Sequence, residues 1–257
     1  MTGSSMGIGK ELVRQILING GKVVITARDK ERLKMVAEEF EIYRDNILIQ
    51  DGDITHFETN EMIVKKTIER FGKLDVLITN AGFSCYGNVE IINPGVVKKV
   101  VDVNIYGSLF PVMASILELK KSRGSILFIS SLAGLYGLPG YSTYSLSKMA
   151  LKALAQSLRI ELKSSGIFVG IAYPGFTENE SEKRTLNPSG ELEEVPPRPK
   201  NLTLSRQETA QKLLRQIEKK KHTETHSVLG NITAILSKYF PGILKVVLSK
   251  NYTKKTG

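Results

Sequence analysis

Short apolar runs alternate with longer amphipathic stretches over most of the chain. The apolar runs are rich in β-branched residues and predict strands near residues 22–27, 46–50, 74–79, 125–130 and 167–172. The amphipathic stretches between them predict helices near residues 7–19, 29–42, 57–71, 93–121 and 142–165. Strands separated by helices in this order predict an α/β fold, in which a doubly wound parallel sheet carries helices on both faces.

A glycine-rich segment, Thr2-Gly-Ser-Ser-Met-Gly-Ile-Gly9, opens the chain with only Met1 before it. In doubly wound folds such a segment follows the first strand, which lies near the middle of the sheet. Without that strand its two neighbours would keep unpaired backbone groups, at a cost comparable with a folding stability of about 5–15 kcal/mol. We therefore expect a truncated first strand and a native start upstream of Met1, and an in-frame stop codon directly upstream would contradict this. The alternative is a chain that borrows a strand or does not fold.

The stretch Tyr144-Ser-Leu-Ser-Lys148 places a phenol and an ammonium group on one face of a predicted helix. An ammonium group beside a phenol favours the phenolate, so it lowers a tyrosine pKa from about 10 toward neutral pH. Such a pair alone is frequent by chance. Here Ser131 lies thirteen residues before Tyr144, at the end of an apolar run, and the glycine-rich segment opens the chain.

These residues, in this order, resemble the pattern of the classical short-chain dehydrogenase/reductase family. That pattern is Thr-Gly-x-x-x-Gly-x-Gly, then Asn-Ala-Gly, a helix asparagine, a serine and Tyr-x-x-x-Lys. The chain matches it over about residues 2–175, at Thr2, Gly3, Gly7, Gly9, Asn80, Ala81, Gly82, Asn104, Ser131, Tyr144 and Lys148. The resemblance implies a Rossmann-type fold and an enzyme that transfers hydride between a nicotinamide cofactor and a carbonyl or alcohol carbon.

The resemblance also implies a role for each catalytic residue. Tyr144 would be the general acid in reduction, and Lys148 would lower its pKa and hold the nicotinamide ribose. Ser131 would hydrogen-bond the carbonyl oxygen and stabilise its developing negative charge. Asn104 would bend its helix and carry a water molecule of the proton relay. Tyr141 is expected to line the substrate pocket with Ser131 and Tyr144.

The predicted cofactor site begins at the glycine-rich segment, where glycines permit a tight turn, close approach of a pyrophosphate and close helix packing. The helix that follows offers unpaired N–H groups and partial positive charge to the phosphates. Asp53 and Ile54 resemble the adenine-edge contact of the family, and Pro174 and Gly175 the segment against the nicotinamide, with Thr177 as a contact of its carboxamide. The predicted cofactor-binding residues are Gly3, Ser4, Ser5, Gly7, Ile8, Gly9, Arg28, Asp53, Ile54, Asn80, Ala81, Gly82, Tyr144, Lys148, Pro174, Gly175 and Thr177.

The end of the second predicted strand favours NADP(H) over NAD(H). An acidic residue there would bind the adenosine ribose and repel a 2′-phosphate, but the chain has Ala27 followed by Arg28. A guanidinium suits a phosphate by charge and by bidentate geometry. We predict NADP(H), with Arg28 and either Ser4 or Ser5 on the 2′-phosphate. The alternative for Arg28 is a solvated residue at the start of a helix.

Length and composition fit one α/β domain of 257 residues with 41% hydrophobic residues. Cys85 is the only cysteine, so no internal disulfide forms and a reducing compartment is compatible with the sequence. The three histidines form no metal-ligand cluster, and we predict no metal. The sequence shows no secretory signal and no uninterrupted apolar run of about 18 residues, so we expect a cytoplasmic protein.

Residues 176–204 are rich in proline and charged residues and follow the cofactor segment, which predicts a lid over the substrate cleft. We place the catalytic domain at residues 1–230, with a short last strand at 227–230. Residues 231–257 carry apolar residues at helical spacing on two short predicted helices. Of the net charge of +10, +8 lies in residues 212–257, which hold ten Lys and Arg against two Glu.

A basic amphipathic helix pair suits the surface of an anionic membrane, and the alternative is packing on its own domain or on a dimer partner. Nucleic acid is not expected, because no recognition motif is present. This ending is similar, more loosely than the family pattern, to 3-ketodihydrosphingosine reductases. That similarity implies an NADPH-dependent reductase of a lipophilic ketone, with hydroxysteroid or 3-oxoacyl carbonyl reduction as alternatives. A catalytically silent lipid-binding or interaction module is the alternative of another class, and the family resemblance implies a homo-oligomer.

Overall fold

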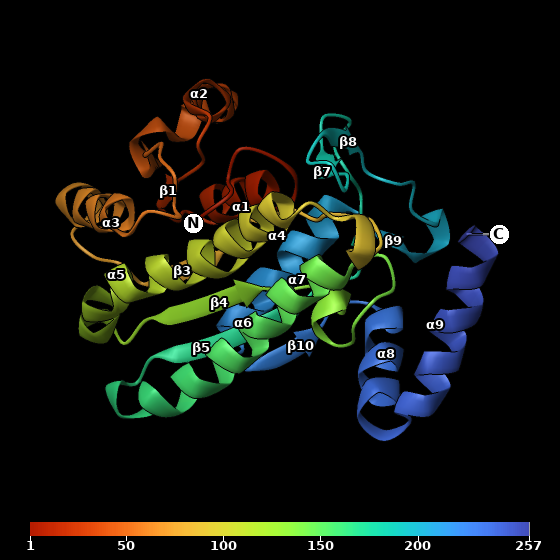
Figure 1. Cartoon of the computed structure of the whole chain (residues 1–257). Helices are drawn as coiled ribbons and strands as arrows, with labels where there is room; N and C mark the ends of the chain where they lie inside the picture. Colours follow the sequence, from red (N-terminus) through yellow and green to blue (C-terminus); the bar gives the residue numbers. More distant parts are fainter. Residues whose placement is uncertain (257) are drawn as a thin grey trace.

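Parallel strands form the centre of the computed structural model, which describes residues 1–256 (Figure 1). Four strands pair in the order β10-β5-β4-β3, and β1 pairs with β2. The strands are β1 (Val23–Ile25), β2 (Ile47–Ile49), β3 (Val76–Thr79), β4 (Ser125–Ile129), β5 (Phe168–Tyr173) and β10 (Thr223–Thr225). The predicted doubly wound α/β class is confirmed, and the predicted strands are within about two residues of those observed.

Thr2 joins the two groups of strands. It forms a parallel bridge with Thr26 beyond the end of β1, and its N–H donates to the Ile78 carbonyl of β3 at 3.1 Å. The terminal amine of Met1 donates to the Val24 carbonyl at 2.9 Å, and burial lowers the pKa of this amine to about 5. Met1 and Thr2 therefore occupy the central position of the sheet, between β1 and β3, which gives the doubly wound strand order.

Helices cover both faces of the sheet (Figure 1). On β4 the side chains alternate, so that Ile126 and Phe128 pack toward α5 and α6, and Leu127 and Ile129 toward α1 and α7. The helices are α1 (Gly7–Ile18), α2 (Lys30–Glu39), α3 (Phe57–Phe71), α4 (Pro94–Val101), a π-helical turn at Asp102–Tyr106, α5 (Gly107–Ser122), α6 (Ser142–Glu161) and α7 (Arg206–Glu218). Short 3-10 turns lie at Glu41–Asn46, Val89–Ile91, Leu132–Gly134, Lys163–Ser165 and Lys200–Leu202.

The helical run Pro94–Ser122 contains an 18-residue window with a mean hydropathy of 1.6, so it is long and apolar enough to cross a membrane by length and composition alone. The run is not an uninterrupted apolar stretch in the sequence, because polar residues such as Asp102 and Asn104 lie within it. In this structure α5 packs against α3 and β3, and its residues Val112 and Leu119 are fully buried in the core. The apolar window is thus partly buried in the core, with 39% of it inside the structure.

Residues 176–204 contain short strands that left no periodicity in the sequence. β6 (Phe176–Thr177) pairs with β9 (Thr203–Leu204), and β7 (Arg184–Leu186) pairs antiparallel with β8 (Leu192–Glu194). Strands of two or three residues are too short for an alternating pattern to be recognised.

The predicted last strand at 227–230 is wrong, because the last strand is β10, a few residues earlier. Ser227 instead begins a helix: its side chain accepts a hydrogen bond from the Gly230 N–H at 3.0 Å. The two predicted C-terminal helices are present as α8 (Val228–Tyr239) and α9 (Pro241–Thr256), so the predicted domain boundary after residue 230 lies inside α8.

Candidate active site

Ser131 and Tyr144 meet at the carboxyl edge of the sheet. Ser131 follows β4 and begins a 3-10 turn, with its hydroxyl accepting from the Ala133 N–H at 3.3 Å. Tyr144 lies in the first turn of α6, and its phenol is hydrogen-bonded to the Ser131 side chain. The end of a buried strand and the start of a buried helix therefore hold the predicted serine–tyrosine pair in contact.

The pKa of Tyr144 lies above its ordinary value, which corrects our expectation that Lys148 lowers it. Burial raises the pKa, and the Ser131 hydrogen bond and the Arg198 charge only partly offset this effect. The Lys148 Nζ lies 5.9 Å from the centroid of the Tyr144 ring and donates to the Ile129 carbonyl at 3.0 Å. Burial, with Lys183 nearby, lowers the pKa of Lys148 itself to about 8. Tyr144 is thus a protonated phenol at neutral pH, the form that donates a proton.

Asn104 lies in the π-helical turn between α4 and α5 and is fully buried, so the predicted local distortion of this helix is present. Its side-chain oxygen accepts from the Phe83 N–H, and its amide donates to the Phe83 carbonyl, both at 3.0 Å. The amide also donates to the Ser147 hydroxyl at 2.9 Å, and that hydroxyl donates to the Tyr144 carbonyl at 2.7 Å. Asn104 therefore fixes the loop after β3 against the helix of Tyr144, which leaves its side chain committed to protein groups.

The glycine-rich segment forms a cradle at the start of α1. A Cβ at Gly9 would lie 1.9 Å from the Gly3 carbonyl oxygen, so only glycine permits this packing. The Asn80 side chain donates to the same carbonyl at 2.7 Å, and the Thr2 hydroxyl accepts from the Asn80 and Ala81 N–H groups at 3.1 Å. Asn80 and Ala81 thus hold the cradle in shape.

Gly7 leaves room on the surface of this cradle, whereas Gly82 permits close approach of Asn104 and Lys148. Gly7, the first residue of α1, has a φ of +58°, and a Cβ at this position would meet nothing within 4 Å. A Cβ at Gly82 would lie 2.8 Å from the Asn104 oxygen and 3.3 Å from the Lys148 Nζ. Open space beside Gly7 and the positive end of α1 fit a pyrophosphate, although the Gly7 N–H donates to the Glu180 carboxylate at 2.9 Å in this structure. Ile8, next in the cradle, packs its half-buried side chain on the core instead.

The predicted adenosine end carries Arg28 and Asp53 near each other. Arg28 is exposed, and its charge acts on Asp53. Burial raises the pKa of Asp53, but hydrogen bonds from Thr55 and the charge of Arg28 outweigh this, so the pKa lies below its ordinary value. Ile54 is buried against Gly107, where a Cβ would lie 3.0 Å from its Cδ1.

Ser4 and Thr177 do not lie as predicted. Ser4 is fully buried, and its hydroxyl donates to the Met1 carbonyl at 2.8 Å and accepts from the Thr26 N–H at 3.2 Å. It cannot reach a 2′-phosphate, which leaves half-buried Ser5 as the candidate.

The hydroxyl of Thr177 is paired with that of Thr209 in α7 at 3.0 Å, and this side chain is buried. Of the predicted nicotinamide segment, Pro174 is buried, and Gly175 faces Ser227, where a Cβ would lie 2.4 Å from the hydroxyl. Tight packing of this segment on α7 and α8, rather than free hydroxyls, fixes its course.

Sequence reasoning missed two cations that residues 176–204 bring close to Tyr144 and Lys148. Arg198 donates to the Thr177 carbonyl, lies 5.9 Å over the Phe176 ring, and its charge acts on Tyr144 and Tyr141. Lys183 lies close enough to Lys148 to lower its pKa, and burial, with Arg198, lowers the pKa of Lys183 to about 8. The lid is rich in charged residues, but neither cation belongs to a recognisable motif, so only the path of the backbone reveals them.

Tyr141 lies near Tyr144 and Arg198. Its ring packs against that of Tyr86 at a centroid distance of 4.9 Å, with the planes tilted by 52°. Burial raises the pKa of Tyr141, and Arg198 partly offsets the effect. Two aromatic rings beside Tyr144 provide an apolar wall, which is consistent with the predicted substrate contact.

Known proteins match this architecture. The family profile described as short chain dehydrogenase matches residues 1–188. The chain is 36% identical over 195 residues to a 3-dehydrosphinganine reductase of Danio rerio, covering 71% of this chain and 59% of that protein. It is 36% identical over 183 residues to an 11-beta-hydroxysteroid dehydrogenase-like protein of Arabidopsis thaliana, covering 68% of this chain and 58% of that protein. The chain belongs to the short-chain dehydrogenase family, and its matches span a little over half the length of these relatives.

Solved structures agree with the family. An alcohol dehydrogenase from Thermococcus sibiricus complexed with 5-hydroxy-NADP is 25% identical, with a TM-score of 0.75 over 88% of this chain and 94% of that chain. ElxO with NADP bound is 26% identical, with a TM-score of 0.73 over 88% of this chain and 92% of that chain.

Proposed function

We propose that the chain reduces a ketone on a lipophilic substrate to a secondary alcohol, with NADPH as the reductant. The contact between Ser131 and the protonated phenol of Tyr144, with Lys148 beside it, carries this proposal. A phenol that keeps its proton at neutral pH suits a general acid, which reduction requires, better than a general base.

Each residue has a defined task. Bound NADPH supplies the hydride. Ser131 orients the carbonyl oxygen and stabilises the negative charge that develops on it, and Tyr144 gives its proton to that oxygen. Lys148 holds the cofactor ribose and provides positive charge beside the phenol. Asn104 positions the loop after β3 and the start of α6, and we propose this positioning role together with the predicted water of the relay.

Arg28 supports NADPH rather than NADH. The guanidinium is exposed at the end of β1, and none of the described residues forms an ion pair with it, so it is available to a 2′-phosphate. The relatives described as bound to NADP or its derivative are consistent with this choice. Thermal melts with each dinucleotide check it: we expect NADPH to raise the melting temperature more than NADH does.

For the substrate we propose 3-ketodihydrosphingosine, because proteins named for this reaction are 33–36% identical to the chain. The test measures NADPH oxidation with 3-ketodihydrosphingosine, an 11-keto steroid and a 3-oxoacyl thioester in parallel. Preference for the sphingoid ketone supports the proposal, and preference for the steroid would transfer it to the hydroxysteroid relatives. NADPH binding without reduction of any of the three would favour the silent lipid-binding module.

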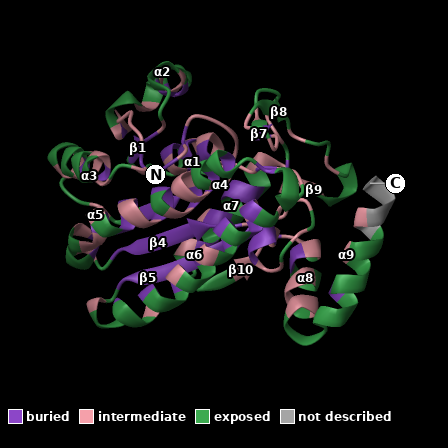
Figure 2. Cartoon of the chain, in the orientation of Figure 1, coloured by how far each residue is buried: buried purple, intermediate pink, exposed green. Residues whose placement is uncertain are grey.

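We also propose that α8 and α9 contact a membrane surface. The helices and Phe240 between them expose large apolar side chains, which are Ile232, Ile235, Tyr239, Phe240, Ile243, Val246 and Val247. Figures 1 and 2 show this pair beside the main body, and α8 starts three residues after the carboxyl end of β10, so its apolar side chains lie near the predicted substrate opening. Lysines among the apolar residues add attraction to anionic lipids. We propose a cytoplasmic protein that takes its lipid substrate from a membrane surface.

We propose a homo-oligomer that forms through α5 and α6. These helices expose large apolar side chains on the outside of the sheet, with Leu117 at 70% and Leu146 at 55% exposure. Paired exposed apolar residues on neighbouring helices suit a two-fold interface. Light scattering of the purified chain tests this, and replacement of both leucines by lysine should yield a monomer; a monomeric wild-type chain would contradict it.

A further inference from the structure

Residues 178–183, which we call the strap, lie between β6 and β7 and are tied to the cofactor cradle by a carboxylate. One oxygen of Glu180 accepts from the Gly7 N–H at 2.9 Å and from the Arg206 guanidinium at 2.6 Å. Gly7 is the first residue of α1, so Glu180 takes the N–H group that the cradle would offer to a pyrophosphate. The chain thus supplies its own anion at this position.

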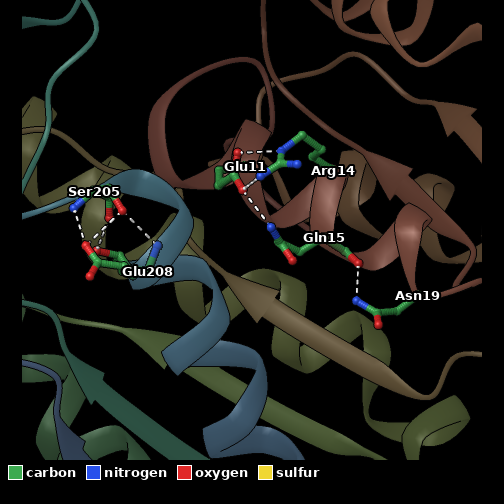
Figure 3. A network of polar contacts seen from close by, with 7 residues as sticks. Glu11, Arg14, Gln15, Asn19, Ser205 and Glu208 are labelled. Atoms are coloured by element: carbon green, nitrogen blue, oxygen red, sulfur yellow. Dashed lines mark hydrogen bonds and ion pairs between the residues drawn. The ribbon is translucent and has the colours of Figure 1, made fainter.

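The position of Arg206 at the start of α7 allows its guanidinium to bind an anion. It is the first residue of α7, after a capping box in which Ser205 and Glu208 satisfy each other's backbone N–H groups. The start of α7 lies beside α1, whose Glu11, Arg14 and Gln15 form their own network on the facing helix (Figure 3). The amino terminus of α1 and the Arg206 guanidinium from the start of α7 therefore converge on the Glu180 carboxylate.

Beside this contact is a cavity of about 320 Å³ that Gly7, Glu180 and Arg206 help to line. It leaves space into which the carboxylate can withdraw without repacking the core. The neighbouring Asn179 has a buried side-chain oxygen with no hydrogen-bond partner in the described structure. A buried oxygen without a partner costs free energy, so a second arrangement of the strap that satisfies this oxygen can be similarly stable.

A second carboxylate ties the strap to α2. Glu182 forms an ion pair with Arg32 at 2.7 Å. Arg32 lies in the first turn of α2, one turn after Arg28, which we assign to the 2′-phosphate. The two glutamates of the strap thus lie at the two places where NADPH carries phosphate groups, and NADH carries phosphate at only the first.

We propose that the cofactor phosphates exchange with the strap glutamates: the pyrophosphate replaces Glu180 and gains Arg206 as a ligand, and the 2′-phosphate replaces Glu182 at the start of α2. This proposal rests on the proposed use of NADPH. The exchange conserves charge pairing, because each released cation meets a phosphate oxygen in place of a carboxylate oxygen. In this proposal Arg206 binds the cofactor, and Glu182 affects how strongly the chain prefers NADPH over NADH.

The test measures the dissociation constants of NADPH and NADH for the full-length chain by titration calorimetry, without any substrate. Loss of a competing charge-assisted hydrogen bond is worth about tenfold in affinity. We expect Glu180→Gln to bind both dinucleotides about tenfold more tightly, and Glu182→Gln to gain only for NADPH. Arg206→Gln should weaken both. Glu194→Gln, an exposed glutamate on β8 of the same lid, is the matched control and should change neither.

Thermal melts identify variants that fold. Folded Glu180→Gln and Glu182→Gln chains that bind no more tightly than the wild type would overturn the exchange, and so would an Arg206→Gln chain with undiminished affinity. These results leave the proposed function intact if the wild type binds NADPH. If Glu180→Gln does not fold, the NADPH-to-NADH affinity ratio of Glu182→Gln decides: an unchanged ratio overturns the exchange. Absence of dinucleotide binding in every folded variant and in the wild type would overturn the proposed function and the exchange together.

Discussion

Tyr144, the proposed general acid, shows that the charge state of a side chain follows from burial as much as from its neighbours. Burial raises its pKa, although Ser131 and Arg198 favour the phenolate. The Lys148 ammonium group, with a pKa of about 8, is half deprotonated near pH 8. A sequence motif names the tyrosine and the lysine but not the amount of water that reaches them. A phenol with a raised pKa suits proton donation to the proposed ketone. Removal of the phenolic hydroxyl is therefore the direct test of this role.

Tyr144→Phe should lower the rate of NADPH oxidation by about 10²–10⁴, the usual contribution of a general acid. The affinity for NADPH should stay within a few-fold, because the cradle and Lys148 are unchanged. Steady-state rates and calorimetric titration measure the two effects separately. Tyr43→Phe, far from the site among the side chains packed on α2, is the control, and retained turnover in Tyr144→Phe would contradict the assignment.

At the scale of elements, the π-helical turn at Asp102–Tyr106 depends on one side chain. Asn104→Ala should destabilise the fold by about 1–3 kcal/mol for each group left unsatisfied, because the Phe83 N–H and carbonyl both lose their partner. Urea unfolding measures the change in the free energy of unfolding. Asn201→Ala, at an exposed position, should change it by no more than about 0.5 kcal/mol, and an equal effect of both variants would argue against this role of the turn.

The helix pair α8–α9 gives a prediction about membranes. Replacing Ile232, Ile235 and Ile243 with glutamine should abolish co-sedimentation with vesicles that contain phosphatidylserine, because each side chain is about half exposed and not needed for the core. The matched control replaces Ile18, Ile42 and Ile160, which are also exposed but lie elsewhere. If both triple variants sediment as the wild type does, α8–α9 is not the contact surface.

The sequence predicted long elements well and short ones poorly. Strands such as β4 and β5 have five and six residues, all buried, so their apolar runs are plain. The strands of the lid have two or three residues and leave no pattern. The sequence pattern predicts a strand at Ser227, because apolar patterning does not show the hydrogen bond that makes this residue the N-cap of α8. The sequence also does not distinguish Ser4 from Ser5, because the burial of Ser4 depends on hydrogen bonds with Met1 and Thr26 that the motif does not show.

At the scale of the whole molecule, His226 joins the last strand, α7 and the centre of the sheet. The amide of Gln216 donates to the Ile171 carbonyl of β5 at 3.0 Å, and its oxygen lies 3.1 Å from the His226 Nε2. An amide oxygen can only accept, so Nε2 donates and Nδ1 carries no proton. Nδ1 is buried without a partner in the described structure. A proton on this nitrogen would be a buried donor without an acceptor, so the structure favours the neutral ring.

Stability should therefore fall in mild acid. Burial lowers the pKa of His226 to about 4 from its ordinary value of 6.5, with Glu224 opposing and Lys212 adding to the effect. Between these pH values the unfolded chain binds the extra proton and the folded chain does not, so the free energy of unfolding decreases as the pH falls, by up to about 3 kcal/mol. Unfolding curves from pH 7 to 4 measure this slope. His226→Gln should flatten it, whereas His56→Gln, on an exposed side chain, should leave it unchanged. Equal slopes in the wild type and His226→Gln would assign the acid sensitivity to the carboxylates instead.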